Sequence, residues 1–201
     1  SEIKSKESTI ESLQIQLGIT VSELEGLKPI TRKYFVAAVD DKGAGAIIPI
    51  ELKITNGTGS VSVNIKDVEL LSGVQDSIRI ATQITDDYTA VNLSKRDIAI
   101  SFINDFGGIV TVDGPSAGGA ITATMIAAFI GKEMNEKVLT TGTIEANGII
   151  GKVGGITEKA LAAKQKGATT FLVPLGQKVS VAGIDVVEVK DITDVLNYVL
   201  K

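Results

Sequence analysis

The stretch TVDGPSAGGA, residues 111–120, places a single serine between a proline and a run of small residues, directly before an apolar segment of helical character. The glycines at 114, 118 and 119 leave room for another chain to approach the hydroxyl of Ser116 closely. A helix that starts here would also aim backbone N–H groups at a developing negative charge. Two interpretations stay open on these residues alone. Ser116 caps the helix, which is the commoner role of a serine at this position, or it is a nucleophile.

The chain on either side of this turn alternates short strands with helices. After Pro29 a period-two pattern of β-branched residues predicts three strands, at 34–39, 46–54 and 60–65, which we expect to form a meander because turn residues separate them. Apolar periodicity predicts helices over 74–85, 116–131, 156–167 and 192–200. Further short strands are expected at 97–102, 109–112, 138–140, from 144, at 170–173 and at 185–189. These patterns predict an α+β fold in which mixed small sheets are flanked by helices.

The N-terminal segment has a different pattern. Apolar residues recur along an otherwise polar stretch at steps of seven, three, four and seven, namely Ile3, Ile10, Leu13, Leu17 and Leu24. This predicts a helix that Gly18 interrupts, followed by a short second helix with a capping box at Thr20 and Glu23. The first helix either packs on its own domain or forms a coiled coil with a partner. We therefore expect an N-terminal helical or linker segment over 1–30 and one domain over 31–201.

The composition excludes several classes of chemistry. The chain has no cysteine and no histidine, so disulfides, thiol catalysis, zinc sites of the Cys/His type and an imidazole base are excluded. Its 20 basic and 24 acidic residues include no dense basic block, so we expect no nucleic-acid partner. The apolar run at 117–131 covers about 15 residues and is too short to span a membrane. The glycine-rich GIIGKVGG at 148–155 lacks the phosphate-loop spacing, and we expect no cofactor and no metal.

A serine nucleophile in this chain needs a base other than histidine. Lysine can serve when its ammonium loses hydration, because its pKa then falls toward neutrality and the neutral amine can accept the serine proton. Lys159 stands out among the lysines because it follows VGGI at the start of an expected helix, where the positive end of the helix dipole disfavours the ammonium.

Four segments resemble the proteolytic domain of the Lon proteases, which use a Ser-Lys dyad. They are DGPSAG at 113–118, TG at 141–142, VGGITEK at 153–159 and KGATTFLVP at 166–174, and SGVQDSIRIA at 72–81 is similar to a helix of archaeal-type relatives. The resemblance is strong over 106–175, looser over 33–105 and absent over 1–30.

The resemblance implies roles for individual residues. Ser116 would be the nucleophile and Lys159 the general base, with Thr141 orienting the lysine amine. Asp113 holds the acidic position of the turn and would modulate the assembly of the dyad. Backbone N–H groups around Ser116 and Gly114 would bind the oxyanion.

Two positions near the site depart from the family pattern. Val112 stands where many Lon sequences have lysine, and Thr143 where many have glutamate, so charge is lost on both sides of the dyad. The ATPase module of full-length Lon is not in this chain. We therefore expect an ATP-independent serine endopeptidase that cleaves flexible or unfolded polypeptides and assembles as a homo-oligomer, with the six-membered ring as the family's common form.

Two other functions remain open at this stage. One is a catalytically inactive Lon-like scaffold that binds polypeptide or assembles oligomers, although such scaffolds lose the serine and the lysine that this chain keeps. The other is a serine hydrolase of esters or a self-processing enzyme. An ATPase module, a signal or a membrane anchor ahead of residue 1 also stays open, and with it a cytoplasmic or a membrane-associated location.

Overall fold

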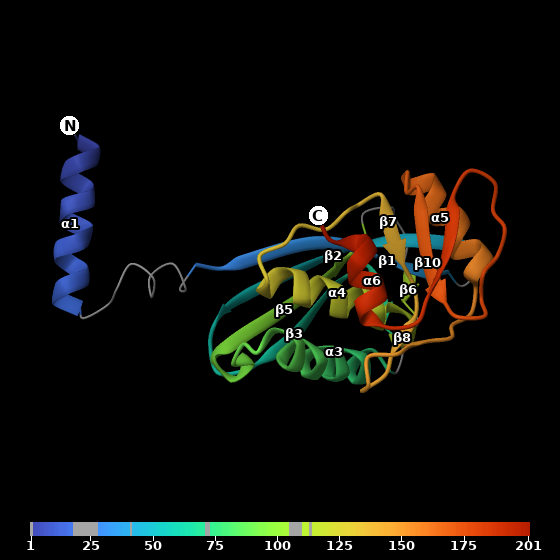
Figure 1. Ribbon diagram of the computed structural model, residues 1–201, viewed down its shortest axis with the longest axis horizontal. Helices are drawn as coiled ribbons and strands as arrows, with labels where there is room; N and C mark the ends of the chain where they lie inside the picture. The colour runs from blue at the N-terminus through green and yellow to red at the C-terminus, as the bar shows by residue number, and fades with distance from the viewer. Residues whose placement is uncertain (1, 18–27, 41, 71–72, 105–109, 113) are drawn as a thin grey trace.

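The computed structural model describes residues 2–17, 28–40, 42–70, 73–104, 110–112 and 114–201 (Figure 1). Two larger β-sheets, two two-stranded pairs and the helices that pack on them make up the described part of the domain from residue 30 onward. The α+β class predicted from the sequence is confirmed, because helices and small mixed sheets alternate along the chain.

The larger sheet contains β1 (Ile30–Val39), β2 (Gly45–Asn56), β3 (Val61–Lys66) and β5 (Arg96–Ile103) in the order β1-β2-β5-β3. Strands β1 and β2 form an antiparallel hairpin with Ile30 opposite Ile54. The predicted meander is wrong, because β5 lies between β2 and β3 and β3 runs parallel to β5. Burial explains this order. Alternate residues of β5 are buried, as suits an inner strand, whereas all of β3 is exposed, as suits an edge.

Four helical segments and a two-stranded ladder accompany this sheet. Helix α3 (Val74–Thr89) packs against α4 (Gly118–Phe129), whose residues up to Ala128 are all buried. A short 3-10 turn η1 (Leu93–Lys95) leads into β5, and a second, η2 (Gly114–Ala117), leads into α4. Strands β4 (Val68–Leu70) and β6 (Val110–Val112) pair in parallel and deliver the chain to η2.

The second sheet is parallel and lies at the opposite end of the domain in Figure 1. Its order is β11 (Asp185–Val189), β10 (Thr170–Pro174) and β7 (Val138–Thr140). Helices α5 (Ile156–Lys166) and α6 (Ile192–Val199) belong to this part of the chain, as does the small hairpin of β8 (Thr143–Ile144) and β9 (Ile150–Gly151). Gly167 ends α5 in the left-handed conformation, as its sequence predicts.

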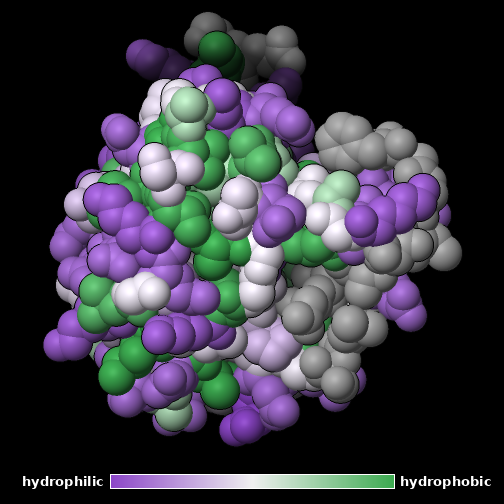
Figure 2. Space-filling model, turned by 90° about the vertical axis from the view of Figure 1, so that its right-hand side faces the viewer, coloured by the Kyte–Doolittle hydropathy of each residue, from purple (hydrophilic) through white to green (hydrophobic). Residues whose placement is uncertain are grey.

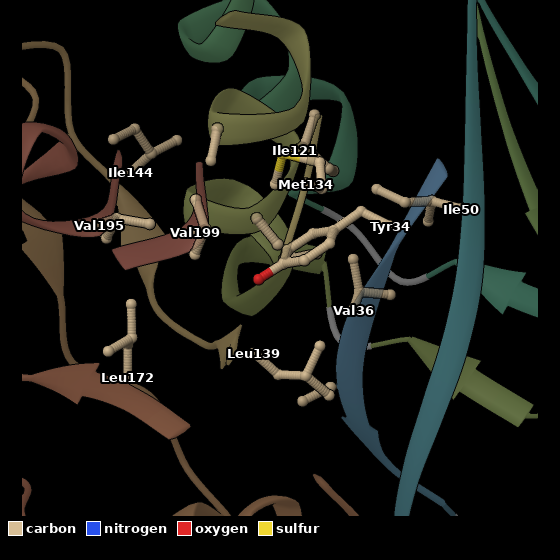
Figure 3. Packing of buried hydrophobic residues seen from close by; sticks show 14 of the residues in the cluster. Tyr34, Val36, Ile50, Ile121, Met134, Leu139, Ile144, Leu172, Val195 and Val199 are labelled. Carbon is tan, nitrogen blue, oxygen red and sulfur yellow. The ribbon is translucent and has the colours of Figure 1, made fainter. Parts of the chain in front are cut away.

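Tyr34 connects the two sheets. Its ring is buried in the core among side chains from β1, α4 and α6 (Figure 3), and its hydroxyl donates a hydrogen bond to the carbonyl of Val138 at the start of β7. Burial raises the pKa of the Tyr34 hydroxyl well above its usual range, which favours the protonated form that donates this hydrogen bond. The larger sheet is thereby tied to the strand that leads into Thr141.

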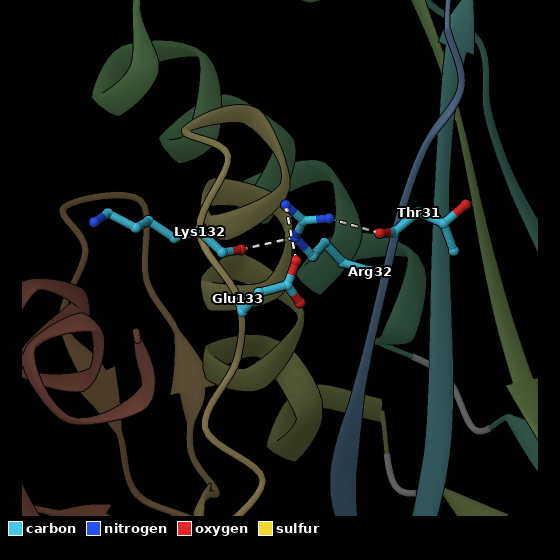
Figure 4. Close-up of polar contacts among 4 residues, drawn as sticks. All are labelled: Thr31, Arg32, Lys132 and Glu133. Carbon is cyan, nitrogen blue, oxygen red and sulfur yellow. Dashed lines mark hydrogen bonds and ion pairs between the residues drawn. The ribbon is translucent and has the colours of Figure 1, made fainter.

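Arg32 makes a second link between distant parts of the chain. Its Nε donates to the carbonyl of Lys132 at 2.7 Å and one of its terminal nitrogens donates to the carbonyl of Thr31 at 2.9 Å (Figure 4). An ion pair with Glu133 at 3.4 Å completes the contact. The segment after α4 is therefore attached to β1 through Arg32. Strand β7 begins shortly after this attached segment.

Helix α1 (Glu2–Leu17) lies apart from the domain in Figure 1. The side chains from Ile3 to Leu13 are exposed, so the alternative in which this helix packs on its own domain is not what the structure shows. The described part of α1 extends to Leu17, and both the predicted break at Gly18 and the second helix expected near Thr20 lie outside the described residues. Among the described residues, no helix is both long and apolar enough to cross a bilayer.

Candidate active site

Ser116 lies in the 3-10 turn η2, and only 4% of its surface is exposed. The N-cap of α4 is Ala117, which makes no side-chain capping bond. The N-cap position of α4 is therefore Ala117 rather than Ser116, because the tight turn inserts one residue between the serine and the helix. The serine lies buried at the entrance of an apolar helix.

The segment after β7 is bonded to this turn. The carbonyl of Ser116 accepts hydrogen bonds from the Gly142 N–H at 3.0 Å and from the Thr141 hydroxyl at 3.4 Å. In return the Gly142 carbonyl accepts from the Gly119 N–H at 3.1 Å. Thr141 is completely buried, and its own N–H donates to Leu172 of β10 at 3.0 Å. The structure therefore joins Ser116, Thr141 and the second sheet through a continuous set of hydrogen bonds.

Glycine is required where the two segments touch. A Cβ on Gly118 would lie 2.7 Å from the side chain of Ile144 and 2.9 Å from its backbone nitrogen. Helix α4 can therefore approach β8 this closely only because the residue after Ala117 has no side chain. The small residues of the stretch 111–120 therefore serve internal packing, in addition to any access that they give to Ser116.

Lys159 is the one charged side chain that is buried in the part of the chain that the structure describes, with 3% of its surface exposed. It lies in the first turns of α5 on the inward face, beside Ile156 and Ala160. The backbone N–H of Lys159 donates the first hydrogen bond of the helix, to the carbonyl of Gly155 at 2.9 Å. Lysine is almost never buried to this extent unless its ammonium is paired, since the ammonium loses its hydration there.

The remaining predicted residues have different outcomes. Gly114 begins η2, two residues ahead of the buried serine. Asp113 lies outside the described residues. Among the described residues no group of acidic side chains has the geometry to hold a metal ion.

Sequence reasoning missed three further residues around the site. Thr140 precedes Thr141 and is buried, and its hydroxyl has no hydrogen-bond partner among the described residues. Gln177 bonds the backbone of Val153 ahead of α5, and Gly45 of β2 packs against the backbone of α5. No pattern in the sequence marks the contacts of Gln177 and Gly45, because each joins segments that lie far apart in the chain.

The surface near α5 has no single chemical character. Figure 2 views the end of the domain that carries α5 and β10, and hydrophobic and hydrophilic residues are mixed across it. A cavity of about 330 Å³ lies between the start of β2 and the outer side of α5, lined by Gly45, Ala46, Ile47, Ile48, Ala162, Gln165 and Lys166. Neither Ser116 nor Lys159 contributes to its lining, so this cavity is separate from the candidate site.

An α+β domain with a buried serine at a helix entrance and a buried lysine on a second helix is an arrangement that suits a hydrolase. Comparison with known proteins defines the family more closely. Residues 37–201 match the family model described as the Lon protease (S16) C-terminal proteolytic domain. Because this match covers most of the chain, the chain belongs to that family.

Individual relatives agree with the family assignment. The chain is 30% identical to Lon protease 2 of Bacillus subtilis (strain 168) over 176 residues, which is 81% of this chain and 32% of that protein. It is 27% identical to the archaeal Lon protease of Archaeoglobus fulgidus over 172 residues, which is 82% of this chain and 27% of that protein. The chain thus spans less than a third of the length of these curated relatives.

Proposed function

We propose that the protein is a serine endopeptidase in which Ser116 is the nucleophile and Lys159 the general base. The observation that carries the proposal is the burial of Lys159 in a chain of the Lon proteolytic family that has no histidine. Burial disfavours the charged form of an amine, and a neutral amine is what a serine nucleophile needs beside it.

The reaction is acyl transfer in two halves. The Ser116 oxygen forms a bond to the carbonyl carbon of a peptide while its proton passes to Nζ of Lys159. The peptide C–N bond then breaks, and the leaving amine takes the proton from Lys159. In the second half a water molecule gives a proton to the lysine amine and attacks the ester, and Ser116 recovers its proton as the ester bond breaks.

The other proposed residues support these steps. Backbone N–H groups at η2, from Gly114 onward, would stabilise the oxyanion, since donors aimed at developing charge lower the barrier most. The Thr141 hydroxyl would orient the lysine amine, and its closeness to Ser116 supports that role. Asp113 would tune the dyad from the same turn.

Membership in the Lon proteolytic family supports a polypeptide substrate. We propose flexible or already unfolded polypeptides as substrates and cleavage without ATP, by a domain that occupies residues 31–201. A homo-oligomer is proposed as its working form, and the N-terminal segment 1–30 with its exposed helix α1 supports a role as linker or oligomer contact.

The test is hydrolysis of an unfolded protein by the purified chain without ATP, compared with Ser116→Ala and Lys159→Ala. We expect the wild type to cleave and both variants to lose turnover by a factor of about a thousand or more while staying folded, because residues of one catalytic unit fail together. Full activity in Lys159→Ala would show that the base is assigned to the wrong residue. A folded wild type that binds the unfolded protein without cleaving it would favour the scaffold function instead, and turnover of esters alone would favour an esterase.

A further inference from the structure

The loop that leads into α5 is held by a side chain from a distant turn. Gln177 lies between β10 and β11, and its amide makes two hydrogen bonds with one residue, Val153. The Val153 N–H donates to Oε1 of Gln177 at 2.9 Å, and Nε2 of Gln177 donates to the Val153 carbonyl at 2.8 Å. Because donor and acceptor of the same residue are both engaged, the amide fixes the orientation of that stretch of backbone as well as its position.

The turn that carries Gln177 is itself braced. One carboxylate oxygen of Glu188, on β11, accepts hydrogen bonds from the N–H of Gly176 at 2.7 Å and of Lys178 at 3.2 Å, the residues on either side of Gln177. The Gln177 N–H donates to the carbonyl of Pro174 at 3.1 Å. The second sheet therefore sets where the amide lies before it reaches Val153.

A pair of glycines separates Val153 from the helix of Lys159. A Cβ on Gly154 would meet no atom within 4 Å, and Gly155 has a left-handed φ of 65°. Glycine permits more backbone conformations than any other residue, so this loop has little stiffness of its own. The first hydrogen bond of α5 runs from the backbone N–H of Lys159 back to Gly155, so the helix continues directly from this loop and a contact that holds the loop also acts on the helix start.

We propose that Gln177 is a positioning residue, whose clamp on Val153 holds the N-terminal end of α5 and thereby the Lys159 amine in the place that the reaction requires. The inference rests on the proposed function of Lys159 as the base. Gln177 touches no reacting atom in this proposal and acts only through the loop.

The test replaces Gln177 by leucine, which keeps the approximate size of the side chain and removes both hydrogen bonds. Gln165→Leu is the matched control, because it makes the same chemical change at an exposed position of α5. Hydrogen exchange of the peptide covering 151–160 reports on the loop without reference to activity. Steady-state cleavage of an unfolded protein, followed across pH, reports on the amine.

We expect faster exchange over 151–160 in Gln177→Leu and a kcat lower by about tenfold at unchanged KM, since small misplacements of a reacting group are costly. The rise of activity with pH should also move to higher pH, because a displaced amine becomes better hydrated and holds its proton more strongly. The control should match the wild type in all three measurements.

The inference is overturned by exchange at the wild-type rate over 151–160, by an effect on KM alone, or by an equal loss in Gln165→Leu. If the wild type cleaves nothing, the proposed function fails on its own terms. In that case two measurements that do not need activity test the clamp, namely hydrogen exchange over 151–160 and the reactivity of Lys159 toward an amine-directed label. If Gln177→Leu changes neither, Gln177 does not hold the helix and the inference is overturned.

Discussion

Two neighbouring threonines at the end of β7 differ in their hydrogen bonding although both are buried. The Thr141 hydroxyl donates to the Ser116 carbonyl, whereas the Thr140 hydroxyl has no partner among the described residues. A buried hydroxyl without a partner loses its hydration and gains nothing in return. The two side chains therefore form a matched pair for substitution.

Replacing each threonine by valine should have opposite consequences. Thr140→Val removes an unsatisfied hydroxyl and should raise the free energy of unfolding by about 1 kcal/mol. Thr141→Val removes a bond to the turn of Ser116 and should lower kcat by about tenfold, since it disturbs the alignment of the reacting groups. Urea denaturation and steady-state cleavage measure the two effects. A loss of stability in Thr140→Val, or full activity in Thr141→Val, would contradict this assignment.

Individual residues of the site differ in how far the sequence could predict them. Ser116 could be singled out from its turn, and Lys159 from the absence of histidine together with its place at a helix start. Thr141 required the family resemblance, because its contact with Ser116 spans 25 positions. The clamp of Gln177 on Val153 spans 24 positions and joins an amide to backbone groups that every residue has, so no sequence pattern marks it.

At the scale of elements, the position of α5 depends on one glycine of the first sheet. A Cβ on Gly45 would lie 2.0 Å from the carbonyl oxygen of Glu158 and 3.0 Å from Cβ of Ala162. The conflict is with backbone rather than with the end of a flexible side chain, so either β2 or the helix must move. Glu158, whose carbonyl oxygen the added Cβ would contact, directly precedes Lys159.

Gly45→Ala should therefore lower the free energy of unfolding by about 1 to 3 kcal/mol, as overpacking does, and should lower activity in the folded fraction. Gly154→Ala is the control, because its Cβ would enter open space, and a change within about 0.5 kcal/mol is expected. Thermal unfolding and cleavage rates give the comparison. Equal behaviour of the two variants would show that α5 does not depend on close contact with β2.

Elements were predictable to the extent that local pattern determines them. The strands at 138–140 and 185–189 and the end of α5 at Gly167 agree with the structure because periodicity and glycine act locally. The predicted order of strands was wrong for a physical reason. Each of β2 and β5 offers a buried face and two pairing edges, and only the packing of the whole sheet decides that β5 lies inside and β3 at the edge.

At the scale of the whole molecule, the candidate site lies where elements of both sheets meet. Ser116 enters through the ladder of β4 and β6, Thr141 follows β7 of the second sheet, and α5 packs on β1 and β2. The hydrogen bond from Tyr34 to Val138 joins the same two parts of the fold. The match to the Lon proteolytic family covers residues 37–201 and so includes Ser116, Thr141 and Lys159.

One comparison decides whether Lys159 acts as a base or only as a positive charge: the rate of cleavage of an unfolded protein as a function of pH by the wild type and by Lys159→Arg. Arginine keeps the charge and cannot give up its proton. We predict that wild-type turnover rises with pH as the neutral amine becomes populated, and that folded Lys159→Arg is inactive throughout. A Lys159→Arg enzyme with the turnover and pH profile of the wild type would contradict the Ser-Lys mechanism.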